Sequence, residues 1–221
     1  MNQFRRLFII MTKPQVAILY LGLVIGLVVY LDKPLSTYIF DADLRKHLPI
    51  LSYLTKAGLG ILYFPIIFGL AIFFRYIHKN PLWEARSWFL FLCLTVPTVI
   101  CVMLKMILGR ARPNLYLQTG EHFYGFYGFK TDANFWSFPS GHTTIIMGVT
   151  LGLSILFPRY FLAFILFGLS VALSRVLLTH HYLSDVLFTI FLTLIEIACL
   201  LSFLKRRDWL SPLWTDRPSR L

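Results

Sequence analysis

The sequence predicts an all-α polytopic membrane protein with six transmembrane helices, and two observations carry this prediction. Of its 221 residues, 57% are hydrophobic and only 14% are charged, whereas about half of an ordinary soluble domain is apolar and about a quarter is charged. Apolar stretches that approach or exceed the roughly 17 to 25 residues needed to cross a bilayer occur at 15–31, 57–77, 87–108, 142–158, 160–178 and 184–204. We therefore expect a single integral membrane domain over residues 1–221.

Polar or helix-breaking residues separate the six stretches. The first follows Arg5 and Arg6 and ends without the small-residue pattern of a signal-peptide cleavage site, so we expect a retained membrane anchor. Residues 32–56 suit either a short interfacial helix or a loop. The fourth stretch begins at a polar motif, and Pro158 leaves only a tight turn before the fifth. The sixth ends at three basic residues, Lys205, Arg206 and Arg207.

Basic residues are distributed unevenly between the two sides of this membrane domain. An even number of spans puts both termini on one side, and that side carries more Lys and Arg, so the positive-inside rule predicts cytoplasmic termini and polar motifs at the outer face. The net charge of +11 is scattered over the ends of the apolar stretches, which argues against a nucleic-acid-binding patch. Acidic residues partly offset the basic ones in the outer loops, among them Asp32, Asp41 and Asp43.

The first of three polar clusters contains two cations. Lys105 lies near the outer end of the third stretch, where snorkelling of its amine to the interface is the ordinary explanation. Arg112 follows seven positions later, about two helical turns, so both cations share a face if the helix continues that far. Pro113 ends the segment, and Arg110 falls on a different face, where we expect a solvated charge. Two cations on one face favour binding of an anion such as phosphate.

The second cluster, Pro139-Ser140-Gly141-His142, directly precedes an apolar stretch. Ser140 is placed to cap a helix, and the free amides of a first helical turn form an anion-binding site. Gly141 lets the backbone approach an oxyanion, and His142 stands where it could protonate a leaving alkoxide. On its own the motif also fits an ordinary capped helix start with an interfacial histidine.

The third cluster joins a cation to a histidine and a carboxylate. Arg175 has a planar guanidinium that suits bidentate contact with phosphate oxygens. His181 and Asp185 are four positions apart, so on one helix face the carboxylate would accept a hydrogen bond from one ring nitrogen and leave the other as a nucleophile. The alternative is that Asp185 simply forms a buried ion pair with an arginine.

In this order the three clusters resemble the three-part signature of the type 2 phosphatidic acid phosphatase superfamily. The pattern runs from Lys105 to Asp185, over residues 105–185, and every position of the signature is matched: Lys105-x6-Arg112-Pro113, Pro139-Ser140-Gly141-His142 and Ser174-Arg175-x5-His181-x3-Asp185. The flanking runs Gly109–Pro113 and Trp136–Phe138 are also similar to those of bacterial lipid A phosphatases.

The resemblance implies a role for each matched residue. His181 would attack phosphorus to give a phosphohistidine, Asp185 would orient its ring, and His142 would protonate the leaving group. The remaining matched residues would bind the phosphate oxygens, and no metal or other cofactor is implied. This phosphate-binding set comprises Lys105, Arg112, Ser140, Gly141 and Arg175.

The implied function is a metal-independent integral membrane hydrolase with its site at the periplasmic face of a bacterial inner membrane. Its partners are the bilayer and a lipid phosphate, with no nucleic acid. The substrate classes of the family leave four candidates open, namely undecaprenyl diphosphate, phosphatidylglycerophosphate, phosphatidic acid and lipid A phosphate. Two alternatives also stay open: a lipid phosphotransferase that uses the same site, and a non-catalytic phosphate-binding membrane protein.

This hypothesis leaves three further features of the sequence unexplained. Residues 114–136 are rich in aromatics, which suits either an interfacial belt or a lid that guides a lipid tail. Glu196 lies in the middle of the sixth stretch, about three turns beyond Asp185, so we expect a protonated or hydrogen-bonded structural residue there. Three cysteines with no metal-ligand spacing are predicted to be small buried hydrophobic residues, namely Cys93, Cys101 and Cys199.

Overall fold

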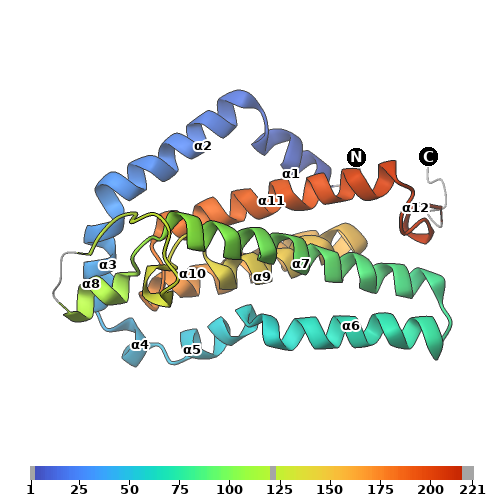
Figure 1. The fold of residues 1–221 in the computed structure, drawn as a ribbon, viewed down its shortest axis with the longest axis horizontal. Helices are drawn as coiled ribbons and strands as arrows, with labels where there is room; N and C mark the ends of the chain where they lie inside the picture. Colours follow the sequence, from blue (N-terminus) through green and yellow to red (C-terminus); the bar gives the residue numbers. More distant parts are fainter. Residues whose placement is uncertain (1–2, 120–122, 216–221) are drawn as a thin grey trace.

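The structure is a computed structural model that describes residues 3–119 and 123–215 (Figure 1). The described residues contain no β-strand, only an isolated bridge between Arg110 and Phe126, so the predicted all-α class is confirmed. The helical elements are α1 (Gln3–Met11), α2 (Pro14–Gly26), the π-helical turn η1 (Leu27–Leu31), α3 (Asp32–Asp41), α4 (Leu44–His47), α5 (Ile50–Leu54), the 3-10 turn η2 (Thr55–Gly58), α6 (Gly60–Tyr76), α7 (Pro81–Leu108), α8 (Pro113–Thr119), η3 (Ala133–Phe135), α9 (Gly141–Leu156), η4 (Pro158–Tyr160), α10 (Phe161–Leu177), α11 (Leu183–Arg206) and α12 (Pro212–Thr215).

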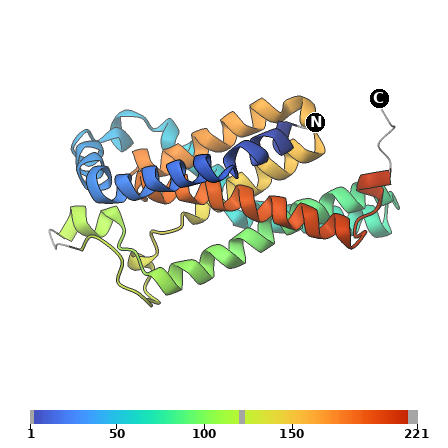
Figure 2. The same cartoon turned by 90° about the horizontal axis from the view of Figure 1, so that it is seen from above.

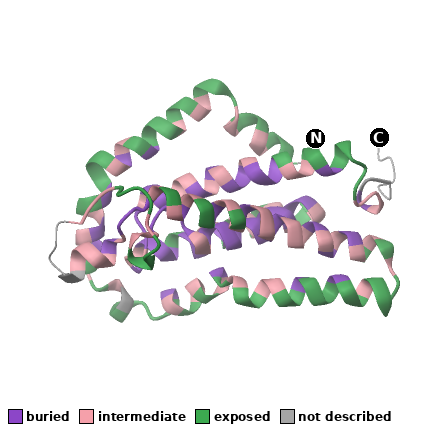
Figure 3. Cartoon of the chain, in the orientation of Figure 1, coloured by how far each residue is buried: buried purple, intermediate pink, exposed green. Residues whose placement is uncertain are grey.

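Helix α9 is the centre of the bundle. It packs against α7, α10 and α11, and most of its residues are buried, whereas α2 and α6 are largely exposed along their outer faces (Figure 3). Small residues allow this close packing, as is usual between membrane helices. A Cβ atom at Gly148 would lie only 2.6 Å from the carbonyl oxygen of Cys93, so the crossing of α9 and α7 requires glycine there.

The membrane class is confirmed, but the six-span count stays a prediction. By length and composition, four helical segments could cross a membrane: Pro14–Asp41, Pro81–Leu108, Pro158–Leu177 and Leu183–Arg206. A fifth is obtained if Ile50–Gly58 and Gly60–Tyr76, bent by 45°, form one span. Helix α9 is a shorter apolar helix, which suits a central position among longer neighbours. Each of the six predicted stretches nevertheless falls on a helix.

The first of these spans continues beyond its predicted end. Residues 32–41 extend the helix as α3 instead of forming a loop, and η1 widens one turn at the junction. Within this π-helical turn the carbonyl of Val28 accepts a hydrogen bond from the hydroxyl of Tyr124. Tyr20 anchors the same span to α11, since its hydroxyl donates to the Leu187 carbonyl at 2.9 Å.

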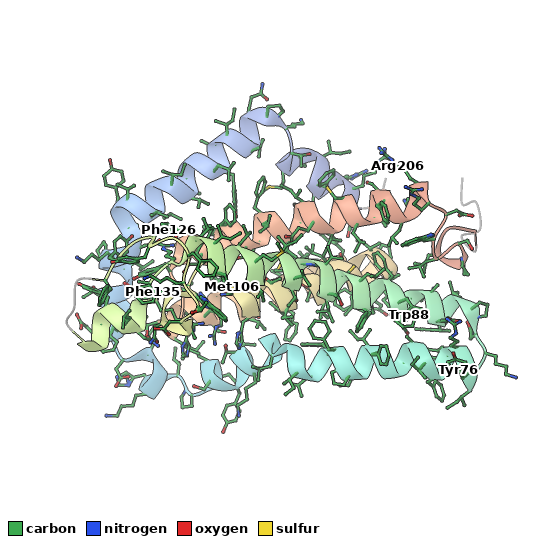
Figure 4. All side chains as sticks on the ribbon, in the orientation of Figure 1. Tyr76, Trp88, Met106, Phe126, Phe135 and Arg206 are labelled. Carbon is green, nitrogen blue, oxygen red and sulfur yellow. The ribbon has the colours of Figure 1, made fainter. Side chains whose placement is uncertain are left out.

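The two ends of the bundle differ in character. The first described residues of α1 and the last turn of α11 lie at one end, and the segment 123–140 lies at the other with α3 and α8 (Figures 1 and 2). Among the labelled side chains, Phe126, Phe135 and Met106 lie toward this second end, opposite Arg206 (Figure 4). The residues of the three polar clusters gather at the end that carries Phe126.

Candidate active site

Five separate parts of the chain supply the residues of the predicted site. Lys105 lies in the last turn of α7, Arg112 follows that helix, residues 140–142 begin α9, and Arg175 lies in the last turn of α10. The loop before α11 and the first turn of that helix supply His181 and Asp185.

Neutral partners hold two of the three cations, Lys105 and Arg175. The Lys105 amine donates to the carbonyl of Trp136 at 2.6 Å, and its Cε lies 3.6 Å from where a Cβ of Gly141 would be. The Arg175 guanidinium donates to the Thr55 hydroxyl at 2.7 Å. The Nε atoms of Arg112 and Arg175 are both buried and have no hydrogen-bond partner among the described residues.

The end of α7 corrects one prediction about these cations. The helix stops at Leu108, and Gly109 adopts a left-handed conformation with φ of 53°, so Lys105 and Arg112 do not share a helix face. A Cβ at Gly109 would lie 2.0 Å from the carbonyl oxygen of Gly128. This turn redirects the chain, and the backbone N–H of Arg112 then donates to the carbonyl of Asn134 at 2.9 Å.

The start of α9 differs in detail from the predicted cap. Ser140 occupies the N-cap position, but its hydroxyl accepts from Thr143 Oγ1 at 2.9 Å and caps no backbone amide. It is fully buried. His142 is half-buried and rests against η2, where a Cβ at Gly58 would lie 2.9 Å from the His142 Cβ. No pattern in the sequence indicates this contact between His142 and the segment before α6.

His181 and Asp185 are close, but not in the predicted arrangement. His181 precedes α11, so the two residues do not stack on one helix face. Its Nδ1 lies 2.7 Å from the carbonyl oxygen of Ser137 and 3.7 Å from Asp185 Oδ2. The Ser137 hydroxyl donates to Asp185 Oδ2 at 2.6 Å, as does the Tyr182 backbone N–H at 2.9 Å. Ser137 therefore stands between the histidine and the carboxylate.

Burial and the nearby positive charges both lower the pKa of His181. Burial lowers its pKa well below the ordinary value, and the positive charges of Lys105, Arg112 and Arg175 lower the pKa further. The hydrogen bond to the Ser137 carbonyl works weakly against this shift. At neutral pH the imidazole is therefore uncharged, which is the state that a nucleophile requires.

The prediction for Arg110 was wrong. Its side chain is fully buried between two carboxylates, with Nη2 2.8 Å from Asp32 Oδ2 and Nη1 bound to Asp185 Oδ1. Asp32 was expected among loop charges and is instead buried in α3. Asp185 thus forms a buried ion pair with an arginine while it also lies beside His181, so the pair alone does not decide between the two roles predicted for this carboxylate. Two charges distant in the sequence carry no periodic signal, so only the fold could reveal this contact.

The aromatic segment packs back onto the end of α7 through backbone hydrogen bonds. Residues 111, 127 and 130 donate to the carbonyls of residues 125, 109 and 106, respectively. Phe138 packs against Phe188 with ring centroids 4.5 Å apart and ring planes tilted by 34°, and Phe126 packs edge-on against Phe138. Positions 120–122 of the predicted loop 114–136 lie outside the described residues. Neither the lid nor the interfacial belt is tested by this packing.

The structure bears on two predictions for the apolar stretches. Both carboxylate oxygens of Glu196 are buried and have no hydrogen-bond partner among the described residues, so of the two predicted states the protonated one stays a prediction. Glu196 lines an apolar cavity of about 550 Å³ between α7 and α11. Cys93 and Cys101 are buried as predicted, but Cys199 is exposed. Within the described ranges, no three His, Cys, Asp or Glu side chains are grouped to hold a metal ion.

Fold and site together define a class of protein. At one end, a helical membrane bundle presents three cations, a neutral buried histidine and a second, more accessible histidine. Such a set of side chains is typical of a membrane enzyme that acts on phosphate groups. The PAP2 superfamily model matches residues 86–209, more than half of the chain, and the chain belongs to this superfamily. The resemblance inferred from the three clusters is therefore confirmed.

Two relatives extend the comparison. The chain is 36% identical over 104 residues to a protein named Lipid A 1-phosphatase from Rhizobium etli and, over the same length, to one of that name from Rhizobium johnstonii. Each match covers 46% of this chain, and it covers 44% and 42% of the two relatives, respectively. The aligned region is thus less than half of either relative. No solved structure matches the chain significantly.

Proposed function

We propose that this protein is an integral membrane phosphatase that hydrolyses a lipid phosphomonoester or diphosphate through a phosphohistidine on His181. The observation that carries the proposal is that Lys105, Arg112 and Arg175 lie at the end of the bundle that holds the buried His181, where burial and their charges lower the pKa of its imidazole. Two of these cations also have a buried Nε without a partner among the described residues. Buried donors normally find acceptors, and phosphate oxygens would supply them.

The reaction has two balanced steps. In the first, the Nε2 lone pair of His181 forms a bond to phosphorus, the bond from phosphorus to the lipid oxygen breaks, and His142 gives a proton to that oxygen. In the second, water attacks phosphorus, its proton passes to His142, and the N–P bond breaks to release phosphate. The three cations, with Ser140 and the Gly141 amide, stabilise the charge on the phosphoryl oxygens.

In this site, fixed side chains would stabilise the negative charge on the phosphoryl group. In other phosphoryl-transfer sites magnesium ions neutralise the developing charge, and here three cations are close enough to His181 to lower its pKa. We therefore propose metal-independent hydrolysis.

The relatives favour one substrate among the four candidates. Both are named Lipid A 1-phosphatase, and the family match of residues 86–209 includes every residue of the proposed site. A phosphate of lipid A is thus the first substrate to test, ahead of undecaprenyl diphosphate, phosphatidylglycerophosphate and phosphatidic acid.

The test is phosphate release from these four lipids in detergent with EDTA present, comparing the wild type with His181→Ala. Release by the wild type that disappears in the variant is expected. Acid-labile label on the wild-type protein after brief incubation with a ³²P-labelled lipid would identify the intermediate. Release that persists in His181→Ala would contradict the proposed nucleophile. Label that moves to a second lipid without net phosphate release would replace the hydrolase with a phosphotransferase, and no reaction of either kind would favour a binding protein.

We also propose that the site faces the periplasm of a bacterial inner membrane and that both termini are cytoplasmic. The concentration of Lys and Arg near the opposite end of the bundle supports this orientation. A Lys130→Cys variant in a Cys199→Ser background tests it, because Cys93 and Cys101 are buried. Labelling of intact cells by a membrane-impermeant maleimide is expected, and labelling only after permeabilisation would reverse the orientation.

A further inference from the structure

Arg110 is a fully enclosed charge, as are the two carboxylates that it contacts, Asp32 and Asp185. Its side chain has no exposed surface, and its guanidinium lies over the rings of Tyr182 and Phe126 with centroid distances of 4.4 and 5.2 Å. Burial alone would lower the Arg110 pKa, but the carboxylates of Asp185 and Asp32 raise it above its ordinary value. The side chain is therefore a permanent cation that does not reach the substrate.

The two ends of the Arg110 guanidinium connect different helices. Nη1 binds Asp185 Oδ1 and donates to the Ser184 hydroxyl at 2.7 Å, both in the first turn of α11. Nη2 donates to Asp32 Oδ2 at 2.8 Å, and Asp32 belongs to α3. A planar fork with two donor ends suits this bridging geometry, which a lysine amine cannot reproduce.

Asp32 also binds α11 directly. Its Oδ1 accepts the backbone N–H of Ser184 at 3.1 Å, and its Oδ2 accepts the Ser184 hydroxyl. The amide of Ser184 is one of the first-turn amides that have no partner within the helix, so a carboxylate from α3 caps the helix that carries Asp185. Asp32 and Ser184 are both buried.

These contacts determine where the Asp185 carboxylate points. Oδ2 is bound by Ser137 and Tyr182, and Oδ1 is bound by Arg110. The carboxylate is thereby held 3.7 Å from His181 Nδ1, where its charge acts on the imidazolium that forms when His181 is phosphorylated. Without Arg110, Oδ1 would lose its ionic partner in a buried environment and the carboxylate would be free to turn.

We propose that Arg110 and Asp32 are positioning residues that hold the Asp185 carboxylate and the first turn of α11 in register with His181. The first membrane span, which contributes no signature residue, thereby takes part in the reaction. This inference rests on the proposed function. The rival role for Arg110, a fourth phosphate-binding cation, disagrees with its enclosure and with the use of both Nη atoms by protein partners.

The test compares Arg110→Met, Arg110→Lys and Asp32→Asn with the wild type, using phosphate release and product inhibition by inorganic phosphate. A positioning role predicts that kcat falls roughly 10- to 100-fold, by analogy with the loss found when residues that orient metal ligands are replaced, while KM and the inhibition constant change by less than about threefold. Arg110→Lys is expected to rescue only part of the loss. Arg75→Met is the matched control, because Arg75 forms an exposed pair with Glu84 at the other end of the bundle.

A double-mutant cycle separates positioning from a merely structural role. Arg110→Met is expected to reduce kcat much less in an Asp185→Asn background than in the wild type, because the carboxylate that it holds is already neutral. Equal losses in both backgrounds, or losses that follow the folded fraction on size exclusion, would overturn the proposal. Should Arg110→Met fail to fold, the near-isosteric Asp32→Asn gives the same kcat comparison.

The remaining outcomes test the positioning role of Arg110 and Asp32 against its alternatives. A normal kcat in Arg110→Met and Asp32→Asn would overturn the positioning role, and a raised KM with a normal kcat would make Arg110 a substrate-binding cation instead. If the wild type itself releases no phosphate, or if His181→Ala retains activity, the proposed function fails and not this inference alone.

Discussion

His181 Nδ1 lies 2.7 Å from the backbone carbonyl oxygen of Ser137. A carbonyl oxygen only accepts, so this hydrogen bond places the ring proton on Nδ1 and leaves the lone pair on Nε2. Ser137 also donates its hydroxyl to Asp185 Oδ2 at 2.6 Å. One serine thus sets the tautomer of His181 through its backbone and binds the carboxylate through its side chain.

Ser137→Ala separates these two contacts. The variant keeps the carbonyl that binds His181 but removes one donor from a buried carboxylate, which costs roughly 1–3 kcal/mol. We expect a lower melting temperature and a kcat reduced by about 3- to 30-fold, measured by phosphate release in detergent. Ser170→Ala is the matched control, since Ser170 is exposed and its hydroxyl only binds the Phe167 carbonyl. A Ser137→Ala enzyme as active as this control would contradict the proposed link.

The lowered pKa of His181 predicts an unusual pH dependence. Because burial and three cations favour the neutral imidazole, the acid limb of kcat/KM that belongs to the nucleophile is expected well below pH 6.5. For stability, the unfolded state binds more protons than the folded state between the folded pKa and about 6.5. The melting temperature should therefore fall as the pH drops below about 6.5, and less steeply in His181→Gln.

Arg112→Gln tests the cause of this shift. Removing one cation should raise the pKa of His181, so the acid limb of the residual activity should move toward pH 6.5. The second ionisation of a phosphomonoester, near pH 6, is the same for both enzymes and cannot produce the difference. An acid limb at the same pH in both enzymes would refute the electrostatic explanation.

Gly58→Ala is expected to displace His142. The added Cβ would lie 2.9 Å from the His142 Cβ and 3.0 Å from its Cδ2, so the ring must shift or η2 must move. A misplacement of about 1 Å in a reactive group can cost on the order of 100-fold in rate, and we expect at least a tenfold loss of kcat. Gly69→Ala on the same side of the bundle is the control, because nothing lies within 4 Å of its added Cβ. Similar kcat values for the two variants would argue against this placement of His142.

Gly109→Ala should destabilise the fold. A left-handed conformation costs a residue with a Cβ about 1–2 kcal/mol, and this Cβ would also lie 2.0 Å from the Gly128 carbonyl oxygen. We expect a loss of more than about 2 kcal/mol, seen as a lower melting temperature or as protein lost on detergent extraction. Gly22→Ala, with nothing within 4 Å, should extract and melt like the wild type; equal behaviour of both variants would show that the turn tolerates a side chain.

Much of the fold could be predicted because hydropathy is a local signal. Each predicted apolar stretch falls on a helix, although α3 extends the first and α7 begins at Pro81, ahead of the predicted 87. The number of membrane crossings could be predicted less well, since α9 is short and α6 is joined to η2 by a bend. Length alone cannot show whether a helix lies within the bundle or spans the bilayer.

The site was predictable where residue type and order carry information. Lys105, Arg112, His142, Arg175, His181 and Asp185 could be selected from spacing and family resemblance, and all lie at one end of the bundle. The residues that contact these side chains could not be predicted from the sequence. Thr55, Gly58 and Asp32 lie far from the signature in the sequence. Thr55 and Gly58 contact Arg175 and His142, and Asp32 contacts Arg110, only because separate helices meet at that end.

The sequence by itself determined the membrane class, the approximate helices and the set of chemical groups at the site, because composition, periodicity and motif order are properties of neighbouring residues. Tertiary structure alone decided which acceptor binds His181, that Arg110 is buried between Asp32 and Asp185, and that Gly58 faces His142. These contacts depend on how helices distant along the chain pack, and a buried charge takes whichever partner that packing brings within hydrogen-bonding distance.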